Sequence, residues 1–330
     1  KHDPAKLTPP SFYPYTLLVR KDWAQNYDSI TFVDGIIGKM LTELEDEGLA
    51  DNTIVFIWSD HGDGLPRAKR WLYDSGTRIP MLVRIPEKYR VNGQGKPGTV
   101  SDELIVGPDF GMTVLNLAGV KVPEYAQGRA FLGKNLTPQR EYVFGARDRM
   151  DERYDIIRTA RDKKYRYLRN FEPWKPYDQF IGYCERGDVM KELRRAEAAG
   201  TLPPGAKLFM GERKPVEELY DTEADPHEIN NLANPPEHQA TLKRMRATQE
   251  KWQAKTLDLA FFPEPIMNQA AAKAGSQWEI LRKAGGAKLV RELRETATLY
   301  EQGPSAIAEL NKRLEADHPA IRYWAVVGLT

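Results

Sequence analysis

The stretch TIVFIWSDHGDG, residues 53–64, decides the fold of this chain. Its first six residues form an apolar run that follows a helical pattern, which is typical of a buried parallel strand. The polar, glycine-rich loop after this run contains Asp60 and His61. In open α/β sheets, ligands bind beyond the carboxyl ends of the strands. Asp60 and His61 are therefore candidate ligands of a cation, and the competing interpretation is a polar turn or helix cap.

The residues on either side extend the α/β pattern. Residues 1–26, rich in proline and aromatic side chains, are expected to form an extended lead-in. Apolar side chains recur at helical spacing over residues 27–48, and a second strand-like run covers residues 79–85. A short helix is expected to start at Asp109. We therefore predict an α/β core over residues 1–140.

The pattern of apolar residues changes after about residue 140. Short apolar runs such as residues 142–144 and 165–168 predict antiparallel strands, and residues 236–257 predict a helix. A modest sheet with a helix packed on it is the simplest arrangement for such a segment. We expect a small α+β subdomain over residues 141–262.

Residues 263–330 are expected to form a helical tail. Residues 317–329 resemble the opening of a HEAT-type repeat, and one such repeat cannot bury its apolar face alone. We therefore expect further repeats beyond Thr330 and a protein partner that binds this HEAT-like tail. Because the chain begins without Met and stops inside a helical pattern, both ends are expected to lie within a longer protein.

Charge and hydropathy exclude several classes of protein. Lys and Arg total 48 against 47 Asp and Glu, a formal net charge of +1, which gives no support for nucleic-acid binding. No apolar run approaches the roughly 18 residues that a membrane span needs. The one cysteine, Cys184, excludes an internal disulfide framework.

Charged residues gather near the Asp60 loop and in one later segment. Lys69 and Arg70 follow the loop closely, and cations beside a metal site stabilise charge on sulfuryl or phosphoryl oxygens. A second charged cluster, residues 147–152, contains Arg149 and Asp151, which we predict to contact substrate. The competing interpretation of both clusters is a solvated surface.

Four segments carry motifs in a fixed order: residues 59–83, the helix of residues 109–119, residues 122–129 and residues 218–232. Together they resemble the sulfatase family, within the alkaline-phosphatase-like superfamily. The spacing from Asp60 to Lys69 is most similar to enzymes related to heparan N-sulfatase. The resemblance implies that the core is the C-terminal part of an alkaline-phosphatase-like α/β sandwich.

The resemblance also implies a chemistry, namely hydrolysis of a sulfate ester or sulfamate on a sulfated sugar or similar compound. In this family a Cys or Ser is oxidised to formylglycine, whose hydrate attacks sulfur, and a divalent cation, commonly Ca²⁺, holds the reacting oxygens. By position, Asp60 and His61 match metal ligands. Lys69 matches the catalytic cation that contacts sulfate, with Arg70 beside it as a substrate contact. Because sulfatases of this type are mostly exported, the resemblance also implies a periplasmic or extracellular location.

Two features depart from the family pattern. The nucleophile motif, Cys or Ser-x-Pro-x-Arg, does not occur, and Cys184 lacks a proline two residues later. The chain is therefore expected to hold half a site and to be inactive alone. His61 stands where some relatives carry Asn, and imidazole suits softer ions than Ca²⁺, so Mn²⁺ or another cation stays open. The rival interpretations are a phosphonate monoester hydrolase or phosphodiesterase of the same superfamily, and a non-catalytic scaffold.

Overall fold

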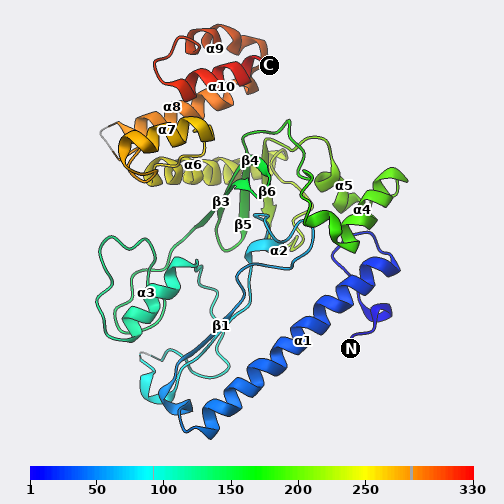
Figure 1. Cartoon of the computed structure of the whole chain (residues 1–330), viewed down its shortest axis with the longest axis vertical. Helices are drawn as coiled ribbons and strands as arrows, with labels where there is room; N and C mark the ends of the chain where they lie inside the picture. The colour runs from blue at the N-terminus through cyan, green and yellow to red at the C-terminus, as the bar shows by residue number, and fades with distance from the viewer. Residues whose placement is uncertain (92, 283–284) are drawn as a thin grey trace.

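The structure is a computed structural model that describes residues 1–91, 93–282 and 285–330. The strands are β1 (Val55–Trp58), β2 (Met81–Arg84), β3 (Val143–Met150), β4 (Arg153–Arg161), β5 (Tyr165–Asn170) and β6 (Glu217–Asp221). The α-helices are α1 (Leu17–Asp46), α2 (Asp74–Thr77), α3 (Pro108–Leu117), α4 (Asp188–Ala198), α5 (Pro204–Met210), α6 (Gln239–Thr256), α7 (Glu264–Ala274), α8 (Gly286–Thr298), α9 (Ile307–Arg313) and α10 (Pro319–Leu329). Figure 1 shows α1 with β1 at one end, the larger sheet in the middle and α7–α10 at the other end.

Helix α1 is longer than the sequence predicts. The Thr16 side chain accepts a hydrogen bond from the backbone N–H of Val19 at 3.4 Å, so the helix begins at Leu17 and not near Tyr27. The expectation of an extended lead-in is therefore wrong from Leu17 onward, because this cap starts the helix directly after the proline-rich segment. Several apolar side chains of its middle and later turns are exposed: Ile30, Phe32, Val33, Ile36 and Met40.

Strands β1 and β2 form an antiparallel pair, in which Val55 lies opposite Arg84 and Trp58 opposite Met81. The prediction of a buried parallel strand over residues 53–58 is wrong in both respects. The connection from β1 to β2 contains only the short α2 and no long helix of the kind that usually joins parallel strands. Among the described residues only β2 pairs with β1, and Trp58 is 49% exposed.

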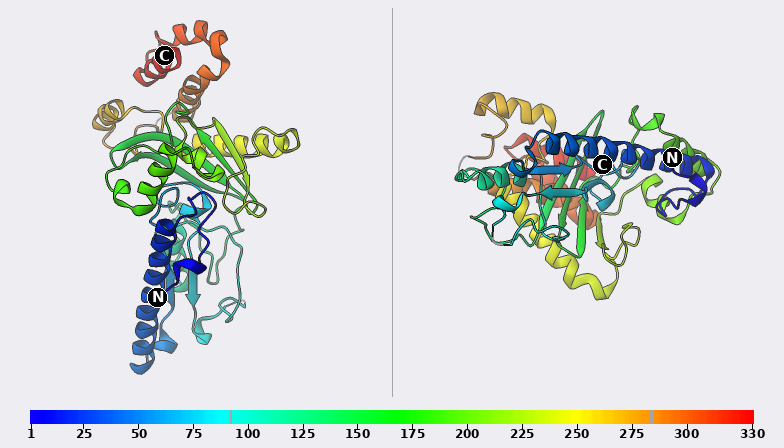
Figure 2. Two further views of the ribbon diagram at one scale, coloured as in Figure 1. Left: turned by 90° about the vertical axis from the view of Figure 1, so that its right-hand side faces the viewer. Right: turned by 90° about the horizontal axis from the view of Figure 1, so that it is seen from below.

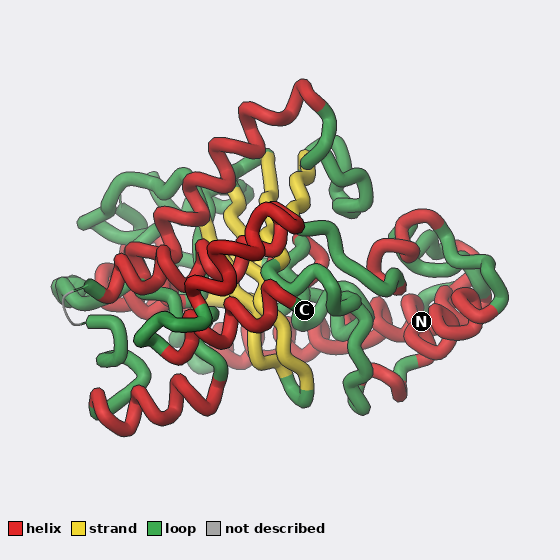
Figure 3. Tube along the Cα trace, turned by 90° about the horizontal axis from the view of Figure 1, so that it is seen from above, coloured by secondary structure: helices red, strands yellow, loops and turns green. Residues whose placement is uncertain are grey.

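The four remaining strands form an antiparallel sheet in the order β3-β4-β5-β6. Because successive side chains point to opposite faces, β4, β5 and β6 each contribute to more than one core. Tyr167 and Leu219 pack against α6, whereas Leu168 and Tyr220 pack in the cluster that contains side chains of α4 and α5. Helices therefore surround the strands, as Figure 3 shows, and the antiparallel sheet with a helix packed on it is confirmed.

The tail is helical and packs through its own core onto the sheet. Trp324 of α10 is 1% exposed, and its indole N–H donates to the Phe261 carbonyl at 2.8 Å. Ile156 of β4 and Phe171 join the same cluster. Figure 2 shows this tail beyond the sheet, on the side opposite α1. Its identity as a HEAT repeat stays a prediction.

Within the described residues, no helix is both long enough and apolar enough to cross a membrane.

Candidate active site

Asp60 and His61 lie in the loop that follows β1. The Asp60 side chain is 84% exposed, the His61 side chain 32%, and their Oδ2 and Nε2 atoms are 3.5 Å apart. The His61 Nδ1 is 2.7 Å from the Gly62 carbonyl oxygen. A carbonyl oxygen can only accept, so Nδ1 carries the proton, and in the neutral ring Nε2 keeps its lone pair. A carboxylate oxygen and a ring nitrogen thus lie close together, an arrangement that fits a cation.

The pair supplies only part of a metal site. In the part of the chain that the structure describes, no three His, Cys, Asp or Glu side chains gather as a metal-binding group. Ca²⁺ takes six to eight oxygen ligands, so this pair alone leaves most of its coordination to other groups. The residues present therefore fit the predicted half-site, and the identity of the ion stays a prediction.

Hydrogen bonds hold the loop in one position. The Gly62 backbone N–H donates to Gly76 at 3.0 Å, and the Ser59 hydroxyl donates to the His61 carbonyl at 2.6 Å. A Cβ on Gly62 would lie 1.8 Å from the Ser75 carbonyl oxygen. Only glycine permits this approach, so the sequence fixes Asp60 and His61 relative to α2.

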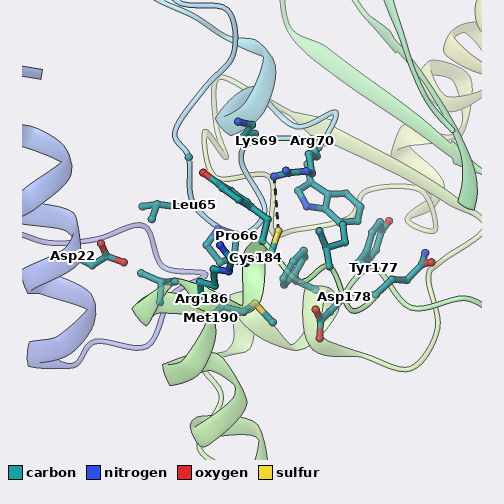
Figure 4. A pocket seen from close by; sticks show the side chains of 18 of the residues that line it. Asp22, Leu65, Pro66, Lys69, Arg70, Tyr177, Asp178, Cys184, Arg186 and Met190 are labelled. Carbon is teal, nitrogen blue, oxygen red and sulfur yellow. Dashed lines mark hydrogen bonds between the residues drawn. The ribbon is translucent and has the colours of Figure 1, made fainter. Parts of the chain in front are cut away.

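Lys69 and Arg70 line a cavity of about 300 Å³ (Figure 4). Arg70 forms an ion pair with Asp151, and its Nη1 lies 3.8 Å from the Cys184 sulfur. The Tyr183 ring centre is 5.6 Å from the Lys69 Nζ and 5.1 Å from the Arg70 guanidinium carbon. Among the described residues Lys69 forms no ion pair with a carboxylate, so its charge is available to an anionic ligand.

The two predicted substrate contacts, Arg149 and Asp151, lie in different places in the structure. Asp151, with a backbone φ of 51°, lies in the turn after β3 and contacts Arg70 beside the cavity. Arg149 does not line that cavity. Its Nη2 donates to the Phe262 carbonyl at 2.6 Å, and its guanidinium lies 5.2 Å from the Tyr154 ring centre. The structure thus places Arg149 against the segment that leads to the helical tail.

A β-bulge explains this difference. The pairing of β3 with β4 shifts between Arg147 and Arg149, and such a shift moves the following side chains to the other face of the sheet. Arg147, which the sequence analysis did not select, lines the cavity instead. Its membership of the same charged cluster was the only signal in the sequence, because a bulge leaves no clear mark there.

The floor of the cavity holds more positive than negative charge. Arg147 is 2% exposed, packs 4.2 Å from the Trp71 ring centre and lies 3.3 Å from an Asp155 oxygen. The same oxygen accepts from Lys214 Nζ at 2.5 Å. Burial lowers the pKa of Arg147 and of Lys214, and the Asp155 carboxylate opposes this. The Asp155 carboxylate therefore pairs with both buried cations, Arg147 and Lys214.

Cys184 has the environment of a structural thiol. Burial raises the pKa of this half-buried group, and the nearby Arg70 guanidinium offsets the effect only in part. The thiol is therefore protonated at neutral pH, whereas a nucleophile reacts as the thiolate. This agrees with the absence of the nucleophile motif around Cys184.

Two family models match the chain. The model described as Sulfatase matches residues 10–120, and the model described as N-sulphoglucosamine sulphohydrolase, C-terminal, matches residues 66–202. The two matches overlap over α2, β2 and α3, so a single continuous segment carries both.

Individual proteins give the same result. An ulvan-active sulfatase of Formosa agariphila is 41% identical over 259 residues, which cover 78% of this chain and 42% of that protein. Human N-sulphoglucosamine sulphohydrolase is 29% identical over 271 residues, which cover 78% of this chain and 52% of that protein. The chain spans about half the length of these curated relatives.

A solved structure, described as a complex with its substrate D-glucosamine-2-N,6-O-disulfate, superposes with a TM-score of 0.50. It is 22% identical and covers 73% of this chain and 43% of its own, so the likeness concerns the fold. This likeness supports the alkaline-phosphatase-like α/β fold that the motifs predicted. Over residues 10–202 the chain is therefore similar to the sulfatase family.

Proposed function

We propose that the protein containing this chain hydrolyses a sulfate ester or sulfamate on a sulfated sugar. The observation that carries the proposal is the Asp60–His61 pair after β1, with Lys69 nearby in sequence and its charge unpaired by any described carboxylate. The relatives named as sulfatases, among them an ulvan-active sulfatase and N-sulphoglucosamine sulphohydrolase, support it.

The roles of these residues follow from their chemistry. Asp60 and His61 would hold a divalent cation, most simply Ca²⁺, with Mn²⁺ or a similar ion as the alternative that His61 favours. The bound ion supplies Lewis-acid stabilisation of negative oxygens. The Lys69 ammonium contacts a sulfate oxygen and offsets the charge that builds on the leaving group. Arg70, held by Asp151, forms the wall on which the rest of the substrate lies.

We propose that the nucleophile, a formylglycine, comes from outside these 330 residues, since its motif does not occur within them. The chain alone is then inactive and contributes the later metal ligands and the sulfate-contacting lysine. A periplasmic or extracellular location is part of the same proposal.

The test uses the full-length protein with an aryl sulfate and an aryl phosphonate. We expect faster turnover of the sulfate, loss of activity with a chelator and recovery with Ca²⁺ or Mn²⁺. Faster turnover of the phosphonate would favour the phosphonate monoester hydrolase, and turnover of neither would favour a scaffold that binds a protein partner through the helical tail.

The Asp60→Ala variant tests the metal role directly. Mutating a residue that merely hydrogen-bonds to a metal ligand typically lowers metal affinity or activity by roughly 10–100-fold. Removing the ligand Asp60 itself should therefore lower kcat/KM by at least that factor. Asp51→Ala is the matched control, because Asp51 is also exposed but precedes β1. Equal activity of the two variants would exclude Asp60 from the metal site.

A further inference from the structure

We propose that the cavity beside Lys69 binds a second anionic group of the saccharide, a carboxylate or another sulfate, through Arg147 and Arg186. The inference rests on the proposed sulfatase function and adds a class of substrate, namely sugars that carry two acidic groups. Figure 4 shows the cavity between α1, α4 and the segment of residues 64–71, with Lys69 and Arg70 on one side and Arg186 on another.

The charge of the cavity is the first step of the argument. Its lining contains four cations, Lys69, Arg70, Arg147 and Arg186, and two carboxylates, those of Asp22 and Asp178. Asp178 is already paired with Arg194, which lies outside the lining. Arg70 and Arg147 likewise pair with carboxylates outside the lining, those of Asp151 and Asp155. Lys69 and Arg186 are then the lining cations that form no ion pair among the described residues, so a sulfate on Lys69 leaves Arg186 for a second anion.

The partners of the two proposed arginines are the second step. Arg186 is exposed and, in the ranges the structure describes, forms no ion pair or side-chain hydrogen bond. Arg147 is buried, yet its Nε finds no hydrogen-bond partner among those residues, and Asp155 must also neutralise Lys214. A buried guanidinium with an unused donor beside a cavity is the arrangement that binds a carboxylate or sulfate with charge-assisted hydrogen bonds.

The walls indicate that the anion belongs to a sugar. Trp71 and Tyr177 line the cavity with Tyr183, and Leu65 and Pro66 complete an apolar side. Its volume of about 300 Å³ is at the lower end of small-molecule sites, which suits one ring with its substituents. Aromatic faces with a few cations suit a saccharide better than a free inorganic ion, which makes no use of the apolar wall.

The experiment compares three probes with the full-length protein: a monosulfated disaccharide with a free uronate, its uronate methyl ester, and the disulfated form of that ester. Dissociation constants are measured calorimetrically, with the intrinsic tryptophan fluorescence, to which Trp71 contributes, as a second readout. The free uronate, the second sulfate or both should bind about tenfold tighter than the monosulfated ester, since a charge-assisted contact is worth about that factor. The two arms distinguish a carboxylate from a sulfate.

Arg186→Gln should reduce the tenfold difference in dissociation constant between the probes to less than about threefold, because half of the predicted contact is gone. Arg213→Gln is the matched control, since Arg213 is also exposed and does not line the cavity. Arg186 is preferred over the buried Arg147, whose replacement can unfold the site. Equal binding of all three probes, or an unchanged difference in Arg186→Gln, would overturn the inference.

Turnover of an aryl sulfate is measured in parallel and separates the two proposals. Turnover without any preference among the disaccharides means that the function holds and the cavity assignment fails. A tenfold preference without turnover means that the cavity binds as inferred and the proposed sulfatase function fails.

Discussion

Gly62→Ala is the substitution that tests most sharply how the metal loop is held. The added Cβ would lie 1.8 Å from the Ser75 carbonyl oxygen and 2.8 Å from its carbonyl carbon, both backbone atoms that no rotamer change can move. The loop must therefore retreat by about 1 Å, a shift that can cost roughly 100-fold in rate when it misplaces a reacting group. Asp60 and His61 would move with it, because they precede Gly62 directly.

The expected effect has two parts. Overpacking of a close contact costs about 1–3 kcal/mol in the free energy of unfolding, which chemical denaturation of the chain measures. Turnover of an aryl sulfate by the full-length protein should fall by about 100-fold, with a lower affinity for the divalent cation. Gly64→Ala is the control in the same loop, because nothing lies within 4 Å of its Cβ position. If Gly62→Ala matched Gly64→Ala in stability and in metal affinity, the packing described for this loop would be incorrect.

Two further predictions concern the body of the fold. Trp324→Ala should lower the free energy of unfolding by about 3–5 kcal/mol, because the side chain is 1% exposed, whereas Trp278→Ala, 57% exposed, should change it by less than about 1 kcal/mol; equal effects in denaturation would refute the packing of the tail. Burial alone would raise the pKa of Asp258, but the Arg158 guanidinium, bonded at 2.6 and 2.9 Å, outweighs it and lowers that pKa. This pair stabilises the fold above the unfolded pKa of about 3.9, and the contribution is lost as the pH falls through the lower folded-state pKa. Asp258→Asn should therefore flatten the pH dependence of stability below about pH 4, and an unchanged acid titration would contradict the assignment.

The sequence predicted best what depends on local pattern. The helix expected over residues 236–257 is α6 with the short turn before it, and the helix expected from Asp109 is α3. Both carry their apolar residues at helical spacing within one segment. The short strands after residue 140 were also predicted, because turn residues and alternating side chains mark them locally.

The start of α1 was missed although its Thr16 cap is local, whereas the other two errors concern features that arise between distant segments. The direction of β1 depends on its pairing with β2, which the strand itself does not encode. The position of Arg149 depends on a bulge in the β3–β4 pairing. Alternation along one strand predicts a face only while the register is regular, so a single bulge exchanged Arg149 for Arg147 at the cavity.

The motifs that carry the resemblance mostly anchor the fold. Asp109 is fully buried, accepts from the Arg129 backbone N–H at 2.8 Å and pairs with Arg140. Glu228 is 1% exposed, accepts from the Asp74 backbone N–H at 2.5 Å and pairs with Arg166 at 2.6 Å.

These contacts join segments far apart in the chain, and each would be costly to remove because it leaves a buried charge without its partner. By contrast, Asp60, His61 and Lys69 are at least partly open to solvent and carry little of the packing. Matching motifs therefore establish the fold more firmly than the chemistry. A variant of Asp109 or Glu228 would lose activity by unfolding, whereas a variant of Asp60 or Lys69 should lose it in a folded protein. That separation is the measurement by which the proposed site can be judged.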